Sequence, residues 1–443
     1  MALRSNLAQL AAALVAVALL AVRPACAAIE LQVWHSLDGA NGLVISKMAD
    51  DFNASQGNYK VITIYKGPYA ETLSGGIAAY RAGAAPHILQ VFEVGNGTMA
   101  AAVGAVKPVS DVFAYSNSPV TPDDLLPVLA TNYLSRSGKL LSLPYNISSM
   151  IMWINRDRFR KAGLDPEQLP RTWPEVFEAA RAIRKADPTS CALSTAWPVW
   201  ANIEQLSAWH DRPVASRANG LAGFDTELEF NRPVQVRHLE NLVTLSREGV
   251  FQYLGRTNLG EAKFLSGDCA IFVTSSAMYG AIRGKNTFDW TVLPMPYYPD
   301  VPEAPQNAIL GGGSLYVMQG KSDLEYRGVS EFLTFILGPE EQAIMYRNSG
   351  YLPITRAAYE EALRSGAYGE NPPLRTAIES VTRKRPTPNS SGLRLGNMLQ
   401  IRDIWAEEIE AALNGAKTAQ QALDDAVARG NEVLRLFRQR TAN

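Results

Sequence analysis

The sequence predicts an α/β protein built from two lobes, followed by a helical C-terminal part. Segments with strand-like and helix-like patterns alternate early in the chain, and the same alternation returns further on. The chain is also 443 residues long, which is more than one compact core usually holds and favours two or three domains of about 100–200 residues. A hydrophobic fraction of 47% excludes a disordered chain.

The first 27 residues have the pattern of a secretory signal. Arg4 precedes an apolar stretch over residues 7–22, and Ala25-Cys26-Ala27 has the small residues of a cleavage site. A retained membrane anchor is the alternative, but the apolar run is short for a hydrocarbon core of about 30 Å. Lipid attachment at Cys26 would need a small apolar run before it, whereas Arg23-Pro24 lies there. We therefore expect a soluble, exported chain, with cleavage of residues 1–27.

The charge balance excludes one class of partner. The whole chain has 42 basic and 43 acidic residues and a formal net charge of -1. Cleavage removes Arg4 and Arg23 and no acidic residue, so the net charge of the mature chain falls by two more units. Because a nucleic-acid partner requires clustered Lys and Arg, and the sequence has no basic run, we expect none.

The first part of the mature chain alternates between strands and helices. Apolar residues alternate in the strand segments and recur three or four positions apart in the helical ones. The predicted elements are a strand over residues 29–36, a helix over 43–52, a strand over 59–65, a helix over 69–81 ended by Gly83, and a strand over 87–94. This order is typical of a parallel sheet covered by helices on both faces.

The later part of the chain repeats the pattern and then becomes helical. A strand is predicted over residues 150–155, a helix up to Ala186 after the capping box Thr172-Trp173-Pro174-Glu175, and a strand over 269–274 that runs into a helix at Ser275. After Gly311-Gly312-Gly313 and a strand over residues 315–318, the pattern is almost entirely helical to Phe437.

Two cysteines, Cys191 and Cys269, remain after the predicted cleavage. An oxidising compartment would permit a disulfide between them. Two separate buried thiols are the alternative. Neither alternative supplies catalysis.

The sequence motifs that would indicate an enzyme are incomplete. Residues 95–100 read G-x-G-x-x-A, as in a dinucleotide loop, but they follow a third strand rather than opening the first strand–helix–strand unit. Gly311-Gly312-Gly313-Ser314 lacks the Gly-Lys-Ser/Thr of a phosphate loop. The four histidines, at positions 35, 87, 210 and 238, have no zinc-binding spacing. We expect no catalytic residue, no metal and no cofactor.

Binding-type residues instead lie at the ends of predicted strands. Residues 65–69, Tyr-Lys-Gly-Pro-Tyr, leave a strand and enter a helix, so Tyr69 and the helix N–H groups would face the edge where α/β proteins bind ligands. Glu93 closes the next strand among apolar residues, where a carboxylate is costly unless it is paired, caps a helix or contacts a ligand. Ser275-Ser276 lies at another strand-to-helix junction. Each position is also compatible with an ordinary cap or turn.

Six segments of the chain resemble one protein family. They are VWHS (33–36), YKGPY (65–69), HILQVFEV (87–94), APQNAI (304–309), SGYLPIT (349–355) and GLRLGNM (392–398). They are similar to the periplasmic sn-glycerol-3-phosphate-binding proteins of bacterial ABC importers, and the resemblance covers essentially the whole mature chain. It implies a maltose-binding-protein-like fold of class II, in which two α/β lobes joined by crossing strands close on a ligand. The implied N-terminal lobe comprises residues 28–147 and 311–352, and the C-terminal lobe residues 148–310 and 353–443.

The resemblance also implies a set of ligand-binding residues. They are Tyr69, Glu93, Ser148, Ser275, Gly312, Tyr351 and Arg402, together with the tryptophan pair Trp197 and Trp200. This sequence departs from the family pattern at Phe92, Ile147 and Pro198-Val199, which bears on selectivity more than on binding. Glycerophosphocholine or another glycerophosphodiester is therefore kept as an alternative ligand, because aromatic walls also suit a quaternary ammonium group.

The chemistry of such a ligand suggests a role for each group. Arg402 can direct a fork of donors at two phosphate oxygens, and the Ser148, Ser275 and Tyr351 hydroxyls and the Gly312 N–H would complete the shell. Glu93 would accept hydrogen bonds from the glycerol hydroxyls, with Tyr69 nearby. The two tryptophans would pack on the carbon chain.

The resemblance implies a monomeric transport protein in the periplasm that meets ABC permease subunits in the inner membrane. Two other classes are kept. One is an exported phosphodiester-processing enzyme or dehydrogenase, which would need a metal cluster or a true cofactor loop. The other is a sensing module of the same fold that is coupled to a receptor.

Overall fold

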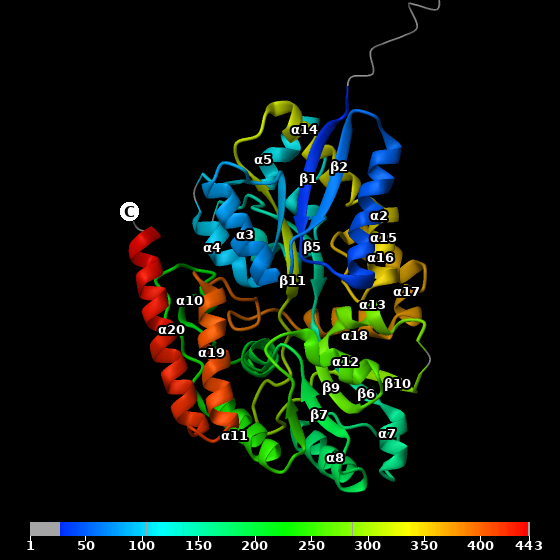
Figure 1. The fold of residues 1–443 in the computed structure, drawn as a ribbon, viewed down its shortest axis with the longest axis vertical. Coiled ribbons are helices and arrows are strands. Elements are labelled where there is room, and N and C mark those ends of the chain that lie inside the picture. The colour runs from blue at the N-terminus through cyan, green and yellow to red at the C-terminus, as the bar shows by residue number, and fades with distance from the viewer. Residues whose placement is uncertain (1–26, 103, 136, 286, 442–443) are drawn as a thin grey trace, which may run out of the picture.

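The computed structural model describes residues 27–102, 104–135, 137–285 and 287–441 (Figure 1). All of the predicted signal segment except Ala27 lies outside these residues. Within the described parts of the chain, no helix is both long enough and apolar enough to cross a membrane. The ribbon has two sheets, one above the other in Figure 1, and each is covered by helices.

The first sheet has the strand order β2-β1-β3-β11-β4, and β5 also pairs with β11. Its strands are β1 (Ile29–His35), β2 (Tyr59–Tyr65), β3 (Ile88–Phe92), β4 (Val106–Lys107), β5 (Leu143–Ser148) and β11 (Gly311–Met318). Strand β1 runs parallel to β2 and β3, as predicted. The sheet as a whole is mixed rather than parallel, because β11 runs antiparallel to β3, β4 and β5.

The second sheet has the strand order β10-β6-β9-β7-β8. Its strands are β6 (Met150–Asn155), β7 (Cys191–Thr195), β8 (Phe251–Tyr253), β9 (Cys269–Ser275) and β10 (Trp290–Pro294). Strand β7 is parallel to β8 and β9, whereas β6 is antiparallel to β9 and β10. We use the term lobe for each sheet with the helices packed on it.

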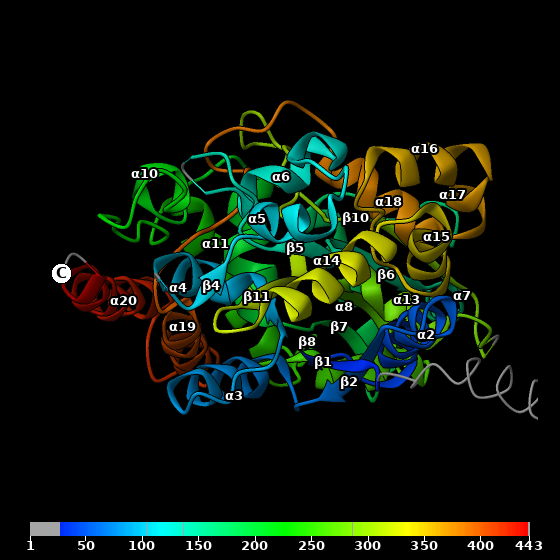
Figure 2. The ribbon, with the colours of Figure 1, turned by 90° about the horizontal axis from the view of Figure 1, so that it is seen from above.

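The helices form layers around both sheets, as the view from above also shows (Figure 2). The α-helices are α2 (Gly39–Ser55), α3 (Tyr69–Arg81), α4 (Asn96–Ala101), α5 (Val109–Phe113), α6 (Pro127–Tyr133), α7 (Arg156–Lys161), α8 (Trp173–Ala186), α9 (Leu206–Trp209), α10 (Ser216–Asn219), α11 (Pro233–Arg247), α12 (Glu261–Leu265), α13 (Tyr279–Ile282), α14 (Asp323–Phe335), α15 (Pro339–Asn348), α16 (Arg356–Arg364), α17 (Ala367–Glu370), α18 (Pro372–Val381), α19 (Met398–Leu413) and α20 (Ala419–Thr441). The 3₁₀ turns are η1 (Glu93–Gly95), η2 (Ala114–Ser116), η3 (Pro122–Asp124), η5 (Asn258–Gly260) and η6 (Ser276–Met278), and η4 (Trp200–Gln205) is a π-helix.

The C-terminal part is less helical than predicted. Residues 382–397 form neither helix nor strand, so the expectation of nearly continuous helix to Phe437 was wrong there. Pro386 and Pro388 lack the N–H that a helix needs, and Gly392 has a φ of 120°. Beyond this segment, α19 and α20 pack side by side along one flank of the molecule (Figure 1). Helix α19 also contacts η1, which brings it to the end of β3.

The two mature-chain cysteines form a disulfide between adjacent strands of the second sheet. Cys191 of β7 lies directly opposite Cys269 of β9, with their Cα atoms 4.3 Å apart. The alternative of two separate thiols is thereby excluded in this structure. The bond closes a loop between residues 78 positions apart in the sequence.

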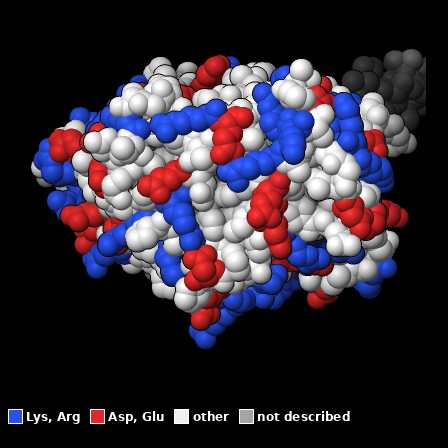
Figure 3. Space-filling model, turned by 90° about the horizontal axis from the view of Figure 1, so that it is seen from below, with Lys and Arg blue, Asp and Glu red and all other residues white. Residues whose placement is uncertain are grey.

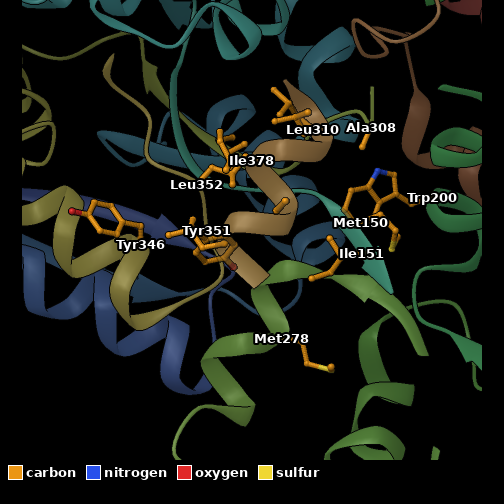
Figure 4. Packing of buried hydrophobic residues seen from close by; sticks show 14 of the residues in the cluster. Met150, Ile151, Trp200, Met278, Ala308, Leu310, Tyr346, Tyr351, Leu352 and Ile378 are labelled. Carbon is orange, nitrogen blue, oxygen red and sulfur yellow. The ribbon is translucent and has the colours of Figure 1, made fainter. Parts of the chain in front are cut away.

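The hydrophobic core continues from one sheet to the other. Strand β5 ends at Ser148 in the first sheet and β6 begins at Met150 in the second, so the chain crosses between the sheets at Ser149. Figure 4 shows buried side chains around this crossing, among them Met150, Trp200 and Leu352. The Ser149 hydroxyl donates a hydrogen bond to the Ile309 carbonyl, 3.1 Å away, on the segment that returns from β10 to β11. The crossing segments are therefore packed against each other.

Residues 354–356 contact the first lobe. The Leu126 N–H donates to the Ile354 carbonyl over 2.9 Å, and the Arg356 Nε–H donates to the Asp123 carbonyl over 2.9 Å. Helix α18, by contrast, contacts β6 and β10 of the second sheet. The predicted lobe boundaries, with residues 353–443 in the C-terminal lobe, stay a prediction.

Charged side chains are mixed over the face seen from below. Figure 3 shows Lys and Arg interspersed with Asp and Glu on that face, without an extended area of one sign. This distribution matches the near-zero formal charge of the sequence.

Candidate ligand-binding site

A cavity of about 410 Å³ lies between elements of the two lobes. Its lining includes every residue predicted for the site: Tyr69, Glu93, Ser148, Trp197, Trp200, Ser275, Gly312, Tyr351 and Arg402. The structure thus brings together residues that are up to 333 positions apart in the sequence. That they bind a ligand stays a prediction at this point.

The ends of strands supply most of this lining. In the first lobe, Tyr69 begins α3 after β2, Glu93 begins η1 after β3, and Ser148 is the last residue of β5. In the second lobe, Ser275 is the last residue of β9. Parallel strands place their carboxyl ends at one sheet edge, which is why residues after β2 and β3 meet there.

Arg402 lies between two carboxylates. Its Nε and Nη2 atoms donate to Oε1 and Oε2 of Glu204 over 2.6 and 2.7 Å, and Nη2 also donates to Oε1 of Glu93 over 2.8 Å. The side chain of Glu204 is 2% exposed, against 13% for Arg402 and 20% for Glu93. Among the described residues, nothing accepts a hydrogen bond from Nη1 of Arg402, so this amino group is available to a ligand.

Burial and charge shift the pKa values in this cluster. Burial raises the pKa of Glu93, and Glu204 adds repulsion, although Arg402 acts in the opposite direction. Burial alone would lower the pKa of Arg402, but the carboxylates of Glu204 and Glu93 outweigh it and raise that pKa. Arg402 therefore stays charged, and the cluster has one cation for two carboxyl groups.

An amide positions the tyrosine hydroxyl at the site. The Asn146 Nδ2 amide donates to the Tyr69 hydroxyl over 2.7 Å, and Gln90 donates to the Asn146 oxygen over 2.7 Å. The Tyr69 ring stacks on Phe92, with centroids 5.1 Å apart and an angle of 9°. Burial raises the pKa of Tyr351 to about 12, so its hydroxyl remains protonated and can donate.

The structure explains Gly312 by packing between strands. Its φ is 92°, and a Cβ at this position would lie 1.9 Å from the Asn146 carbonyl oxygen. A side chain is therefore excluded by β5 as well as by the left-handed backbone. The expected close approach of this backbone to a ligand is not needed to account for the glycine.

The two tryptophans take different positions at the cavity. Trp197 has a φ of 50°, which is unusual for a large side chain and is typical of strain at functional sites. Trp200 is 5% exposed and packs on Gly311, where a Cβ would lie 2.2 Å from its ring. Trp209, the next tryptophan, is buried and does not line this cavity.

Ser275 also serves as a helix cap. Its hydroxyl accepts a hydrogen bond from the Ala277 N–H over 3.1 Å. The next residue, Ser276, donates to the Gly350 carbonyl over 2.6 Å, which links β9 to the segment that carries Tyr351. The cap and the predicted ligand role are compatible, since a hydroxyl can accept and donate at once.

Sequence reasoning missed three acidic residues at the site. Glu204 pairs with Arg402, and Asp38 and Glu261 line the cavity. Burial raises the pKa of Glu261 to about 7, although the Thr274 hydroxyl donates to it over 2.7 Å. A signal for Glu204 was present: it is a carboxylate in an apolar segment four positions after Trp200, the same kind of signal that identified Glu93.

The remaining motifs have structural roles. Gly97 of the G-x-G-x-x-A segment faces the Leu395 carbonyl, which a Cβ would approach to 2.1 Å, so this glycine packs against residues 392–398. His210 and His238 are buried, and burial lowers their pKa values to about 4 and about 3. Across the described ranges, no group of three or more His, Cys, Asp or Glu side chains is arranged to hold a metal ion.

Comparisons with known proteins all identify bacterial solute-binding proteins as the relatives of this chain. The family described as bacterial extracellular solute-binding protein matches residues 47–376. The sn-glycerol-3-phosphate-binding periplasmic protein UgpB of Yersinia enterocolitica is 46% identical over 416 residues, which cover 94% of this chain and 94% of that protein. The Escherichia coli K12 protein of the same name is 46% identical over 409 residues, covering 92% of this chain and 93% of that one.

Solved structures show the same architecture at lower identity. UgpB from Mycobacterium tuberculosis in complex with glycerophosphocholine matches with a TM-score of 0.75 and 18% identity, over 94% of this chain and 99% of that one. Maltose-bound MalE3 of T. maritima matches with a TM-score of 0.74 and 18% identity, over 92% and 100%. These likenesses establish a maltose-binding-protein-like fold of two lobes, as the sequence predicted.

Proposed function

This chain belongs to the family of bacterial extracellular solute-binding proteins, and from that premise we propose that it captures sn-glycerol 3-phosphate for an ABC importer. The observation that carries the proposal is the cavity between the lobes, which gathers hydroxyl, aromatic and guanidinium groups from both of them. The printed ligand of relatives that are 46% identical supports the choice of ligand.

The phosphate is assigned to the donors around Arg402. The Nη1 amino group supplies two N–H donors, and charge-assisted hydrogen bonds of this kind are the stronger ones in proteins. The hydroxyls of Ser148, Ser275 and Tyr351 and the Gly312 N–H complete the shell. Because Glu93 and Glu204 already pair with Arg402, the phosphate is held by directed donors rather than by a net positive charge.

The glycerol part is assigned to Glu93 and the aromatic residues. Oε1 of Glu93 accepts from Arg402, which leaves Oε2 to accept from a ligand hydroxyl. Tyr69 lies beside Glu93 in the same lining, and Trp197 and Trp200 cover the carbon chain.

Ligand binding is coupled to the position of the lobes. The proposed contacts come from strand ends of both lobes, so a bound ligand makes more of them when the lobes are close. A ligand with this difference in contacts shifts the population toward closure. The closed form is the one we propose the permease subunits recognise in the periplasm, after removal of the signal peptide.

Glycerophosphocholine is a second candidate, and the charges of the lining favour it. Asp38, Glu93 and Glu261 are three carboxyl groups in the lining, and Arg402 is its one basic residue among those described. A zwitterionic ligand fits such a lining better than an anion does, and the aromatic side chains suit a quaternary ammonium group.

Calorimetry of the mature chain, beginning near Ala28, tests the ligand. We expect saturable binding of sn-glycerol 3-phosphate, of glycerophosphocholine or of both, and no binding of maltose. Binding of maltose alone would contradict the proposal. Chromatography of the ligand after titration checks the proposal that the chain is not an enzyme, since any hydrolysis product would revive the phosphodiesterase alternative.

Two further measurements test the oligomeric state and the role of the protein in transport. Ultracentrifugation at the concentrations used for binding checks that the chain is a monomer. Deletion of the gene for this chain, followed by growth on sn-glycerol 3-phosphate as sole phosphate source, distinguishes a transport role from a sensing role. Loss of uptake with an intact permease supports transport, and loss of a transcriptional response with normal uptake supports a sensing module.

A further inference from the structure

Glu204 pairs with Arg402 but does not line the main cavity. It belongs to the π-helix η4, and both of its carboxylate oxygens accept hydrogen bonds from Arg402. It lines instead a separate small cavity of about 20 Å³, which Glu93 and Arg402 also line. Glu204 can therefore act on a ligand only through Arg402 and through its charge.

The charge of Glu204 changes what the site offers to an anion. Without it, Arg402 and Glu93 would form a neutral pair, and Nη1 of Arg402 would still be available to donate to a ligand. With it, the three side chains carry one net negative charge when both carboxyl groups are ionised. The donors of Nη1 remain, but every additional negative charge on a ligand is opposed by Glu204.

We propose that Glu204 is a specificity-determining residue that lowers the preference of the site for doubly charged phosphomonoesters relative to singly charged phosphodiesters. This inference rests on the proposed function, since it concerns the same site. A phosphomonoester carries about 1.5 to 2 negative charges near pH 7, and a diester carries one. Because Glu204 neutralises Arg402, the site recognises the phosphate by hydrogen-bond geometry rather than by charge. Monoesters and diesters can form the same hydrogen bonds, but they differ in charge.

The size of the effect follows from Coulomb's law. A unit charge about 7 Å away, at an effective dielectric constant of about 20, changes an equilibrium constant by about tenfold or more. The quantity to measure is the ratio of two affinities, because a structural disturbance at Arg402 weakens both ligands and cancels in the ratio.

The test uses calorimetry with sn-glycerol 3-phosphate and glycerophosphoglycerol, a diester with an uncharged headgroup. Glu204→Gln removes the charge and is expected to shift the affinity ratio toward the monoester by about tenfold. Glu204→Asp keeps the charge and shortens the side chain, so it is expected to leave the ratio within about twofold even where both affinities fall. Glu408→Gln is the matched control: Glu408 is also buried and paired with two cations, Lys417 and Arg429, but it does not line the cavity.

An unchanged ratio in Glu204→Gln, or an equal shift in Glu204→Asp, overturns the inference. If the wild-type protein binds neither ligand, the proposed function fails instead, so the two failures are distinguishable. The affinity ratio of the wild type at pH 7.5 and pH 5 provides a test without a variant, because the monoester becomes singly charged below a pKa of about 6.

The diester, whose own charge does not change between these pH values, shows how protonation of the protein alone affects binding. Among the groups around the cluster, burial raises the pKa of Glu93 above the usual value for a glutamate. Burial also raises the pKa values of Tyr69 and Tyr133 above the usual value for a tyrosine, so both hydroxyls stay neutral over this range. Discrimination by charge predicts that the ratio moves toward the monoester as the pH falls. A move toward the diester contradicts it.

Discussion

At the scale of single residues, Arg402 links ligand binding to stability. Replacing it by Ala removes the proposed phosphate donors and leaves the half-buried Glu93 and the buried Glu204 without their cation. We expect the ligand affinity to fall by about 30-fold or more, since hydrogen bonds to charged groups contribute about 1.5–3 kcal/mol each. We also expect a lower melting temperature, because an uncompensated buried charge is strongly destabilising. Calorimetry and thermal unfolding measure the two effects.

A control for this substitution is available on the surface. Arg256 makes a similar two-pronged contact with Glu410, over 2.8 and 2.6 Å, but its side chain is 41% exposed. Arg256→Ala should therefore leave ligand affinity unchanged and cost at most about 1 kcal/mol of stability. If Arg402→Ala binds the ligand within a few-fold of wild type, the phosphate assignment is wrong.

Glu93 is assigned to the glycerol hydroxyls. A substitution can distinguish its contribution to glycerol binding from the binding of the phosphate. Glu93→Gln keeps the shape of the side chain and weakens its acceptor. We expect about tenfold weaker binding of glycerol-headed ligands, while inorganic phosphate, which does not need the Glu93 acceptor, competes at least as well as before. Competition titrations measure both, and an equal loss for the two ligands contradicts the assignment.

Glu341 is a buried acid away from the cavity. Burial, with added repulsion from Asp51, raises its pKa to about 7, and its Oε2 atom has no partner among the described residues. Because the pKa is higher in the folded than in the unfolded protein, stability falls as the pH rises from about 4.5 through 7. Glu341→Gln should raise the free energy of unfolding by about 1–3 kcal/mol at pH 8 and by little at pH 5.

Urea unfolding at the two pH values measures this difference. The neighbouring Glu340 is exposed, so Glu340→Gln should change stability by less than about 0.5 kcal/mol at either pH. A gain in Glu341→Gln that is equal at pH 5 and pH 8 would show that the carboxyl group does not titrate in this way.

At the scale of single residues, resemblance and pattern together placed every expected side chain at one cavity. They did not place Glu204: its position in an apolar segment was a signal, but its partner Arg402 lies almost 200 positions away. Nor could they show that Gly312 is required by the Asn146 carbonyl on a neighbouring strand. Partners of this kind are fixed by the packing of distant segments.

At the scale of elements, periodicity predicted the bounds of several segments without error. Strands β2 and β6 and helices α3 and α8 have the predicted residues, and the Thr172 capping box begins α8. The relative direction of the strands could not be predicted in the same way. Strand β11 pairs antiparallel with three strands because it returns from the second lobe, and this long-range feature is not contained in the local pattern. The π-helix η4 was also not foreseen, since it depends on one extra residue in a turn.

The disulfide joins two elements and gives a prediction at this scale. Cys191 and Cys269 close a loop of 78 positions, so replacing both by Ser should lower the free energy of unfolding by about 2–4 kcal/mol. Cys269 and Ser275 lie at opposite ends of β9, so ligand affinity should change by less than about twofold. Urea unfolding and calorimetry measure these effects, and a reductant should destabilise the wild type but not the double variant.

At the scale of the whole molecule, the position of the lobes decides whether the two halves of the site meet. The Gly350 segment, which precedes Tyr351, contacts the second lobe at Ser276. A Cβ on Gly350 would lie 1.7 Å from the Ser276 carbonyl oxygen, which belongs to the backbone and cannot swing away. Gly350 therefore permits the close contact between Tyr351 in the cavity wall and the end of β9.

Gly350→Ala should separate Tyr351 from Ser275 and so weaken ligand binding. Overpacking of this kind costs about 1–3 kcal/mol, which corresponds to about 5- to 150-fold in affinity if the whole cost falls on the ligand-bound form. The strain should also favour a more open molecule, measurable by small-angle X-ray scattering with saturating ligand. Gly369→Ala is the matched control, because a Cβ there meets nothing within 4 Å. Wild-type affinity in Gly350→Ala would show that this contact does not set the distance between the lobes.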